Sequence, residues 1–278
     1  MSFLKLIRPL NCAMSAVAVF IGGFIGTGMA IFSESALPGI VLAMLAVFLF
    51  VAAGNALNDF EDRDVDKKAH PERPVASGKI RPQTALRLSY ILFFCAAILS
   101  AFIHFPRFQP LLLLAVNLIV MLAYEKRLKS EGLSGNLSIA WLTSSLFLFG
   151  AVAADSINRV TAIFILTAFF SILGREIVKD IEDLEGDRGT RRTLPITSGV
   201  GLSSALAALS FAVAIAISPL PYFLNLLSQY YLAIVLAADA IFIYCIILLG
   251  RKYPGDSQKF AKAGMLLSLV AFAVGVIK

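Results

Sequence analysis

The chain has 278 residues, of which 59% are apolar and only 15% are charged, and its mean hydropathy is +0.84. Soluble domains have roughly 45–50% apolar and about 25% charged residues, so this composition excludes a water-soluble globule. A membrane-spanning helix needs about 20 apolar residues, which makes a multi-span membrane protein the expected class. The net charge of +6 does not indicate a nucleic-acid partner, because the basic residues lie between apolar segments and form no run.

Nine apolar segments are long enough to cross a membrane. They lie at about 11–32, 37–58, 84–104, 108–124, 134–154, 158–179, 198–218, 227–249 and 260–277. Proline, glycine and serine residues separate them, and none of the segments shows the period-two alternation of a strand. We therefore expect an all-α polytopic fold, with one domain over 1–278 and nine transmembrane helices around a central cavity.

The distribution of Lys and Arg predicts the orientation. With the amino terminus in the cytoplasm, only Arg107, Arg159 and Lys278 of the 24 basic residues fall on the outer side. We expect a multi-pass protein of the cell membrane whose amino terminus and polar loops face the cytoplasm.

Two loops on the predicted inner side begin alike, at 58–83 and 179–197. Residues 58–66 (NDFEDRDVD) align without a gap with residues 179–187 (KDIEDLEGD). Acidic residues match at a constant offset of 121 positions, in the pairs Asp59/Asp180, Glu61/Glu182, Asp62/Asp183 and Asp66/Asp187. The similarity predicts a pseudo-repeat of two related helical bundles, each with an acidic loop.

Both acidic loops place aspartates at i, i+3 and i+7, which share one face if the helix continues. Neighbouring carboxylates repel one another, and a hard cation such as Mg²⁺, which takes oxygen ligands, relieves that repulsion. Each of these rows of aspartates, here called a stripe (Asp59, Asp62 and Asp66; Asp180, Asp183 and Asp187), contains no His or Cys, which argues against zinc or copper. The expected metal ligands are Asn58, Asp59, Asp62, Asp66, Asp180, Asp183 and Asp187. The expected catalytic residues are Asp62, Asp66, Asp183 and Asp187.

Two Mg²⁺ sites at a membrane surface suit a diphosphate, since the metals neutralise it and make it a good leaving group. Nearby cations would complete the site, and an apolar cavity between the helices would accept an isoprenoid chain. The candidates for substrate binding in the loops are Lys67, Arg73, Lys126, Lys129, Lys179, Arg191 and Arg192. Asn55 lies four residues before Asp59, and Arg8 and Asn11 open the first span. Arg8 has two open interpretations: it binds a second phosphate, or it is an ordinary positive-inside anchor.

The acidic loops resemble the two aspartate-rich motifs of the UbiA superfamily of intramembrane prenyltransferases. Residues 58–66 followed by Arg73-Pro74 resemble the first motif, and residues 179–187 followed by Thr193-Leu194-Pro195 resemble the second. The resemblance covers the whole chain. It implies that Mg²⁺ bridges the motifs to a prenyl diphosphate, which ionises at C1 to an allylic cation that an acceptor attacks.

A Tyr-x-x-x-Lys element of that family is altered in this chain. It appears as Tyr124 with lysines two and five positions later, which leaves both Lys126 and Lys129 as candidate phosphate contacts. Tyr124 itself joins the expected substrate-binding residues through this resemblance.

Within the family, the segments 6–12, 54–59, 175–180 and 218–222 resemble a branch that builds archaeal ether lipids. This resemblance adds Arg175 to the substrate-binding residues. It implies transfer of a geranylgeranyl group from its diphosphate to the free hydroxyl of 3-O-geranylgeranylglyceryl phosphate. The implied partners are thus a prenyl diphosphate, a phosphorylated prenyl-glycerol acceptor and membrane lipids.

Two alternatives stay open. A prenyltransferase of the same family could use an aromatic acceptor, such as a quinone precursor or chlorophyllide. A transporter or cation channel could also carry repeated carboxylates, but these should lie near mid-depth in broken helices and not at one surface. Three polar residues lie within the predicted spans. Asp239 has two open interpretations, a functional group or one that bonds to a neighbouring helix, and Asn117 and Asn136 are expected to bond between helices.

Overall fold

The structure is a computed structural model that describes residues 2–104, 106–189 and 192–277. Within these ranges, nine helices are long and apolar enough to cross a membrane, which confirms the nine predicted spans. They are α2 (Pro9–Thr27, extended by the 3₁₀ segment η1, Gly28–Phe32), α3 (Leu37–Glu61), α5 (Pro82–Phe102), α6 (Gln109–Lys126), α7 (Leu133–Ala153), α8 (Arg159–Glu182), α10 (Leu194–Ile217), α12 (Gln229–Gly250) and α13 (Pro254–Gly275). The short elements are α1 (Ser2–Ile7), α4 (Arg63–Ala69), η2 (Leu128–Ser130), α9 (Leu184–Asp187) and α11 (Leu220–Phe223).

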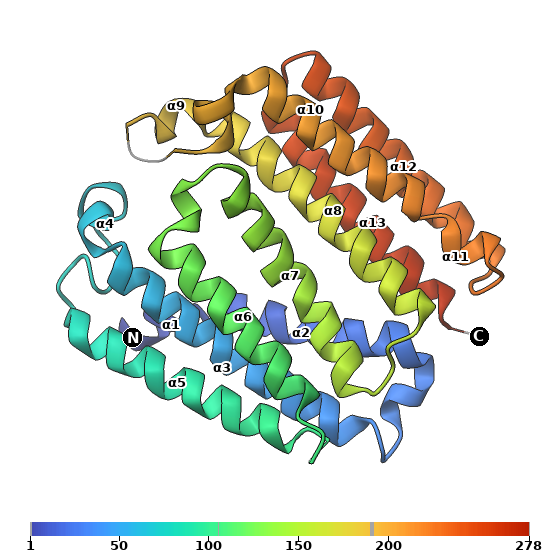
Figure 1. Ribbon diagram of the computed structural model, residues 1–278, viewed down its shortest axis with the longest axis horizontal. Helices are drawn as coiled ribbons and strands as arrows, with labels where there is room; N and C mark the ends of the chain where they lie inside the picture. Colours follow the sequence, from blue (N-terminus) through green and yellow to red (C-terminus); the bar gives the residue numbers. More distant parts are fainter. Residues whose placement is uncertain (1, 105, 190–191, 278) are drawn as a thin grey trace.

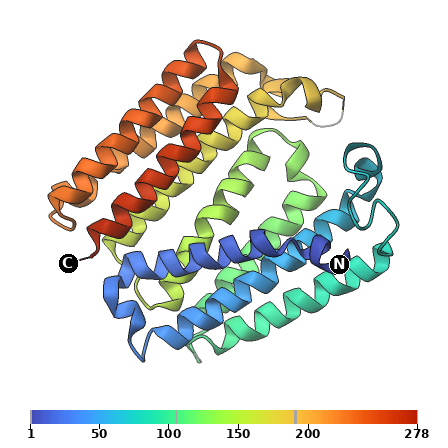
Figure 2. The ribbon, with the colours of Figure 1, turned by 180° about the vertical axis from the view of Figure 1, so that it is seen from behind.

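The long helices form two sets that repeat the same packing order. In the first set α3 packs along both α2 and α5, and in the second α8 packs along both α7 and α10. The leading helices of the two sets, α2 and α7, pack against each other, and α13 covers α12 and α8 (Figures 1 and 2). The second set therefore repeats the first, as the duplicated acidic loops predict.

Glycines allow α2 and α7 to approach closely. A Cβ atom on Gly22 would lie 2.0 Å from the carbonyl oxygen of Phe147, and one on Gly150 would lie 1.8 Å from that of Val19. No larger residue fits at either place, so backbone packs directly on backbone, as small residues permit in membrane helices.

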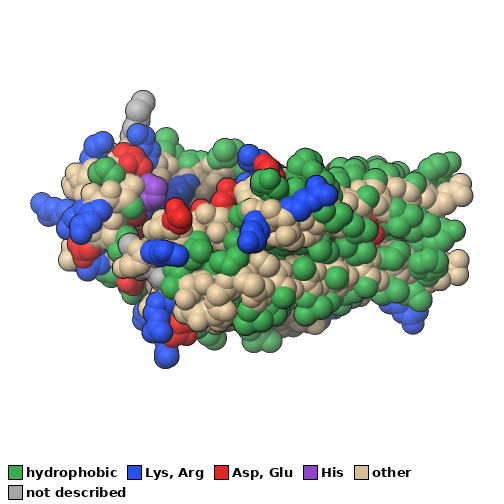
Figure 3. Space-filling view, turned by 90° about the horizontal axis from the view of Figure 1, so that it is seen from above, with side chains coloured by type: hydrophobic (Ala, Val, Ile, Leu, Met, Phe, Trp, Pro, Cys, Tyr) green, Lys and Arg blue, Asp and Glu red, His purple; other side chains and the backbone are tan. Residues whose placement is uncertain are grey.

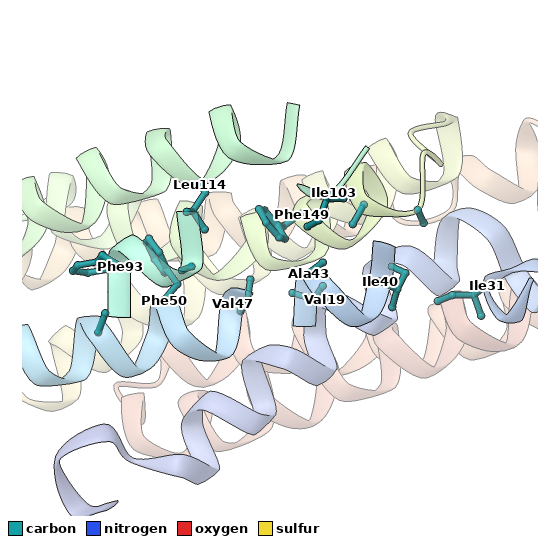
Figure 4. Packing of buried hydrophobic residues seen from close by; sticks show 14 of the residues in the cluster. Val19, Ile31, Ile40, Ala43, Val47, Phe50, Phe93, Ile103, Leu114 and Phe149 are labelled. Carbon is teal, nitrogen blue, oxygen red and sulfur yellow. The ribbon is translucent and has the colours of Figure 1, made fainter. Parts of the chain in front are cut away.

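Side chains of the first set fill a continuous apolar core. Val19 from α2, Val47 and Phe50 from α3, Phe93 from α5 and Phe149 from α7 belong to it (Figure 4). Large apolar side chains also cover the outer surfaces of the helices, as with Phe94 on α5 and Ile119 on α6. A bundle that is apolar inside and outside fits a hydrocarbon solvent.

The polar segments lie at one end of the bundle. The short helices α4 and α9 project from that end, and the loop that joins α6 to α7 lies between them (Figure 1). Figure 3 shows the acidic and basic side chains gathered over this end, whereas the other end of that face is largely apolar. The charged minority of the chain is therefore concentrated where the two acidic loops meet.

The span expected at 198–218 lies at Val200–Phe223. The helix α10 itself begins earlier, at Leu194, because Leu194-Pro195 starts a turn of helix that a kink at Gly199 (φ 84°) separates from the span. Glycine adopts such a positive φ at little cost, so the chain can turn there between the loop and the apolar segment.

Candidate active site

Both acidic motifs lie where a long helix ends. α3 ends at Glu61 and α8 at Glu182, and the next residues, Asp62 (φ −87°, ψ 5°) and Asp183 (φ −82°, ψ 2°), separate each from a short helix. The expected unbroken continuation is therefore interrupted, at the same position in both motifs. The i to i−4 hydrogen bonds nevertheless continue through the break, from the Asp66 amide to Asp62 (2.8 Å) and from the Asp187 amide to Asp183 (3.0 Å).

Each aspartate of the first motif pairs with a cation from a different segment. Asp59 accepts a hydrogen bond from Arg8 Nη2 at 2.7 Å and is only 1% exposed. Asp66, also buried, accepts one from Arg73 Nη1 at 2.6 Å. Asp62 accepts one from Lys129 Nζ. The protein thus compensates the whole stripe with its own cations, and burial makes these charged hydrogen bonds strong.

The amino-terminal segment positions Arg8. Leu6 of α1 is fully buried and packs in a cluster with Val75 and Ile80 from the loop after α4. The Asn55 side chain donates a hydrogen bond to the Ile7 carbonyl oxygen (2.9 Å), which attaches the same segment to α3. Arg8 then takes a left-handed backbone conformation (φ 51°) between α1 and α2. A non-glycine residue rarely adopts that conformation, so the surrounding packing holds it there.

The loop between α6 and α7 contacts the first motif through Lys129. Its ammonium group bonds to Asp62 and, at 3.1 Å, to Glu125 Oε2. The Asn58 amide donates to Asp62 Oδ2 (2.9 Å) and to Glu125 Oε2 (3.1 Å) in the same network. Burial opposes the charged form of Lys129, but the bonds and charges of Asp62 and Glu125 outweigh it and raise the pKa of this lysine. Lys126, by contrast, is exposed, so Lys129 is the lysine directed at the acidic groups.

The second motif has weaker partners. Asp180 Oδ2 accepts a hydrogen bond from the Asn136 amide at 2.9 Å, and no ion pair reaches Asp180 from the residues that the structure describes. Asp183 lies 3.9 Å from Lys179 Nζ, with both side chains nearly half exposed (49% and 43%). Arg175 pairs with its neighbour Glu176.

A small polar pocket of about 50 Å³ lies beside the second motif. Lys129, which bonds to the first motif, and Asp180 of the second both line it. The full lining is Tyr124, Lys129, Gly132, Gly135, Asn136, Ile139, Glu176, Lys179, Asp180 and Thr193. The pocket therefore brings two acidic and two basic side chains, Glu176, Asp180, Lys129 and Lys179, to a common space.

The oxygen atoms at this end suit a hard divalent cation. Two buried ones, Asp59 Oδ2 and Asn136 Oδ1, have no hydrogen-bond partner in the described part of the chain, although buried oxygens are nearly always bonded. The donors are carboxylates and amides, which Mg²⁺ prefers. The residues present therefore fit Mg²⁺, although among the described residues no three or more His, Cys, Asp or Glu side chains form a group that could hold a metal.

The remaining candidates for substrate binding lie at varied distances from the acidic groups. Lys67 turns to Asp64 (2.9 Å), and both are exposed. Asn11 is exposed, as is Arg192, whose carbonyl oxygen accepts the Gly132 amide (2.9 Å). Arg191 is outside the described residues.

Two polar residues near the acids were missed by sequence reasoning: Glu125 and Glu176. Asn136 was expected to bond between helices, and its bond from α7 to Asp180 on α8 confirms this, as does the bond that Asn117 accepts from the Trp141 indole N–H (2.9 Å). Glu176 had a usable signal, because it lies 121 residues after Asn55 and four before Asp180. Asp239 bonds to Ser218 (2.7 Å), which joins α12 to the end of α10.

The fold and the site define a multi-pass membrane protein whose polar chemistry lies at one end of the bundle. The sequence pattern of the UbiA prenyltransferase family matches residues 18–270. The chain belongs to this family, and the transporter and channel alternatives are therefore wrong. The acids of its two motifs lie at helix ends and not at mid-depth, where the repeated carboxylates of a transporter are expected.

Relatives of this chain carry a more specific name. The digeranylgeranylglyceryl phosphate synthase of Methanosarcina mazei is 39% identical over 99% of this chain and 98% of its own length. The protein of the same name from Methanococcus aeolicus is 34% identical over 98% of this chain and 96% of its own length.

Solved structures show the same fold. One from work on digeranylgeranylglyceryl phosphate synthase in membranes is 35% identical, covers 99% of this chain and 98% of its own, and superposes with a TM-score of 0.89. A UbiA homologue from Archaeoglobus fulgidus, bound to GPP and Mg²⁺, is 17% identical with a TM-score of 0.74, over 100% of this chain and 99% of its own.

Proposed function

We propose that this chain transfers a geranylgeranyl group from geranylgeranyl diphosphate to the free hydroxyl of 3-O-geranylgeranylglyceryl phosphate, releasing diphosphate. The observation that carries the proposal is the polar pocket that Asp180 of the second motif lines together with Lys129, whose ammonium group bonds to Asp62 of the first motif. Relatives at 34–39% identity over nearly the whole chain, named digeranylgeranylglyceryl phosphate synthase, support the choice of substrates.

The oxygen donors of the two motifs are the proposed ligands of Mg²⁺: Asn58, Asp59, Asp62, Asp66, Asp180, Asp183 and Asp187, with Asn136 added by its unpartnered oxygen. Bound there, Mg²⁺ would neutralise the diphosphate and make it a better leaving group. Asp62, Asp66, Asp183 and Asp187 remain the proposed catalytic residues.

Side chains of this chain supply the rest of the chemistry. Lys129 and Arg73 lie beside the carboxylates and can share the negative charge that develops on the diphosphate as its bond to C1 breaks. The apolar helices beyond the pocket exclude water, which would otherwise capture the allylic cation. The acceptor hydroxyl attacks C1, and its proton passes to the released diphosphate or to a carboxylate of the motifs.

Arg8 is the proposed contact for the phosphate of the acceptor. It bonds to Asp59 through one nitrogen atom while its side chain stays 31% exposed, so other N–H groups can face a second anion. The diphosphate of the donor and the phosphate and hydroxyl of the acceptor then lie at the same end of the bundle. The predicted cytoplasmic orientation of this end belongs to the same proposal.

A transfer assay tests the proposal. Membranes that contain the protein are incubated with labelled geranylgeranyl diphosphate and, separately, with 3-O-geranylgeranylglyceryl phosphate, an aromatic quinone precursor or chlorophyllide. We expect labelled diether product from the glycerol acceptor alone, and its loss when EDTA replaces Mg²⁺. Transfer to an aromatic acceptor with none to the glycerol phosphate would contradict the proposed substrate.

A further inference from the structure

A second cavity lies further along α7 and α8, in the apolar part of the bundle. It has a volume of about 260 Å³ and lies between α7, α8 and α13. On α7, Ile139 lines the polar pocket and Thr143, one turn further, lines the cavity. On α8, Glu176 and Ile172 are related in the same way. Because residues four apart on a helix lie on one face, the cavity follows the pocket along both helices.

The walls of the cavity are mainly apolar. Its lining includes Ala168, Ile172, Met265, Leu266 and Leu269. The hydroxyls of Thr167 and Ser171 donate to carbonyl oxygens of their own helix, at 2.8 and 2.6 Å, so their protons are not available to a ligand, and the Ser268 hydroxyl is a buried lining group with no partner among the described residues. A hydrocarbon chain is the ligand chemistry that such a lining accepts.

Three phenylalanine rings line the far end. On α7 and α8 the lining residues farthest from the acidic end are Phe147 and Phe164, and on α13 it is Phe272. The direction of α13 is fixed by its start, since a Cβ atom on Gly255 would lie 3.0 Å from Glu182 Oε1 at the acidic end. Each of the three helices thus contributes one ring at the same depth limit.

The rings support one another. The centroids of Phe147 and Phe164 are 4.8 Å apart and those of Phe164 and Phe272 are 5.0 Å apart, which are distances of favourable aromatic contact. Phe272 in turn packs on buried Tyr231 at 5.0 Å, in a core cluster that also includes Ile25 and Val235. A tightly packed core backs the rings, so they cannot yield to a longer ligand without a cost.

We infer that Phe147, Phe164 and Phe272 limit the length of the prenyl chain that the enzyme accepts. The inference rests on the proposed function, because it places the diphosphate at the polar pocket and the chain in the cavity below. From Asp180 to Phe164 the helix rises about 24 Å, at about 1.5 Å for each residue. A donor with one more isoprene unit than geranylgeranyl meets the rings, and removal of a ring gives it room.

Two variants test from opposite directions whether the three rings, here called the ring floor (Phe147, Phe164 and Phe272), limit the chain length. Phe164→Ala opens the end of the cavity, and Ala168→Phe places a new ring one turn nearer to the acids. Farnesyl, geranylgeranyl and farnesylgeranyl diphosphates are compared with the same glycerol phosphate acceptor by kcat/KM. We expect Phe164→Ala to raise the farnesylgeranyl to geranylgeranyl ratio by at least about tenfold, since even one methylene is worth that much in a close-fitting pocket. Ala168→Phe should raise the farnesyl to geranylgeranyl ratio by a similar factor.

Phe50→Ala is the matched control. Phe50 is 5% exposed and packs edge-on against Phe93 at 5.2 Å, whereas Phe164 is 4% exposed and packs edge-on against Phe147 at 4.8 Å. Phe50 does not line the cavity, so its loss should lower stability and leave the donor ratios within about twofold of the wild type. A change of donor preference is a gain that misfolding cannot produce.

The outcomes separate the two proposals. If the wild-type protein transfers no prenyl group from geranylgeranyl diphosphate, both the proposed function and the ring floor are wrong. If the wild type is active and both Phe164→Ala and Ala168→Phe keep its donor ratios, only the ring floor is wrong. Should Phe164→Ala fail to fold, Phe164→Leu and Ala168→Phe decide the question by the same ratios.

Discussion

The two acidic motifs share one sequence spacing and one position at a helix end, yet their surroundings differ. Three cations from three separate segments hold the first motif, through the pairs Arg8–Asp59, Lys129–Asp62 and Arg73–Asp66. In the second motif, Asp180 has an amide partner and Asp183 a long, half-exposed ion pair with Lys179. The repeat therefore preserves the carboxylates and the break in the helix but not the means of compensating their charge.

This difference indicates different roles for the two motifs. The first motif organises the fold, because its ion pairs join α3 and α4 to the α1–α2 junction, to the loop after α4 and to η2. In the second motif Asp180 and Asp183 keep their oxygens less committed, and a cation that arrives with a diphosphate meets less competition at these two residues. Buried carboxylates that lose a partner cost far more than exposed ones, so the two motifs should respond differently to substitution.

Catalysis should depend on both motifs, whereas stability should depend on the first alone. We expect Asp62→Asn and Asp183→Asn each to lower the transfer rate by about a hundred- to a thousandfold, the range found when one group that stabilises transition-state charge is removed. The rate is measured at saturating donor over a range of Mg²⁺ concentrations. Asp64→Asn is the control, because Asp64 is exposed and pairs only with its neighbours Arg63 and Lys67. Full activity in both Asp62→Asn and Asp183→Asn would remove the motifs from the mechanism.

Loss of a cation should destabilise the first motif much more than the second. We expect Arg8→Ala to lower the free energy of unfolding by about 3 kcal/mol, because it leaves the 1% exposed Asp59 without its cation. Lys179→Ala should cost less than about 1 kcal/mol, since its pair with Asp183 is long and half-exposed. Unfolding is followed by denaturant titration in detergent micelles. Adding Asp59→Asn to Arg8→Ala should recover most of the stability that Arg8→Ala loses. Equal losses from Arg8→Ala and Lys179→Ala would contradict the contrast between the two motifs.

The sequence alone predicted the nine helices and the two acidic loops, because span length, turn residues and the 121-residue offset are all local patterns. It could not predict that Asp62 and Asp183 interrupt their helices, since the backbone bond pattern runs through both breaks. It also could not choose between Lys126 and Lys129. That choice depends on η2, a short 3₁₀ turn that directs the second lysine at Asp62 and leaves the first in solvent.

Long-range partners were the hardest to predict. Asn136 reaches Asp180 across the α7–α8 contact, and Glu125 reaches Asn58 across the sequence, so neither pair leaves a spacing signal. Arg8 was left between two interpretations, and its bond to Asp59 shows that it does more than mark the inner side. The donor chain-length limit was also not predictable, because its three rings come from three helices that only the fold brings together.

The two lysines after Tyr124 provide a smaller test within the first motif. We expect Lys129→Ala to raise the KM for geranylgeranyl diphosphate by about ten- to thirtyfold, because a hydrogen bond to a charged group is worth about 1.5–3 kcal/mol. Lys126→Ala should leave KM within about twofold, since Lys126 is exposed. KM is measured with both variants in the same membranes. A larger effect from Lys126→Ala would assign the phosphate contact to the other lysine.

The smallest expected effect is in the second motif, at the amide that holds Asp180. We expect Asn136→Ala to weaken activation by Mg²⁺ by about tenfold, the lower end of the range for residues that orient a metal ligand. The variant removes both the 2.9 Å hydrogen bond to Asp180 and an unpartnered oxygen at the pocket. Asn117→Ala is the matched control, because Asn117 is buried to the same degree but bonds to Trp141 away from the acids. The Mg²⁺ concentration that gives half of the maximal rate should shift only in Asn136→Ala. If it shifts equally in both variants, the effect comes from helix packing, and the contrast between the two motifs no longer includes the coordination of Asp180.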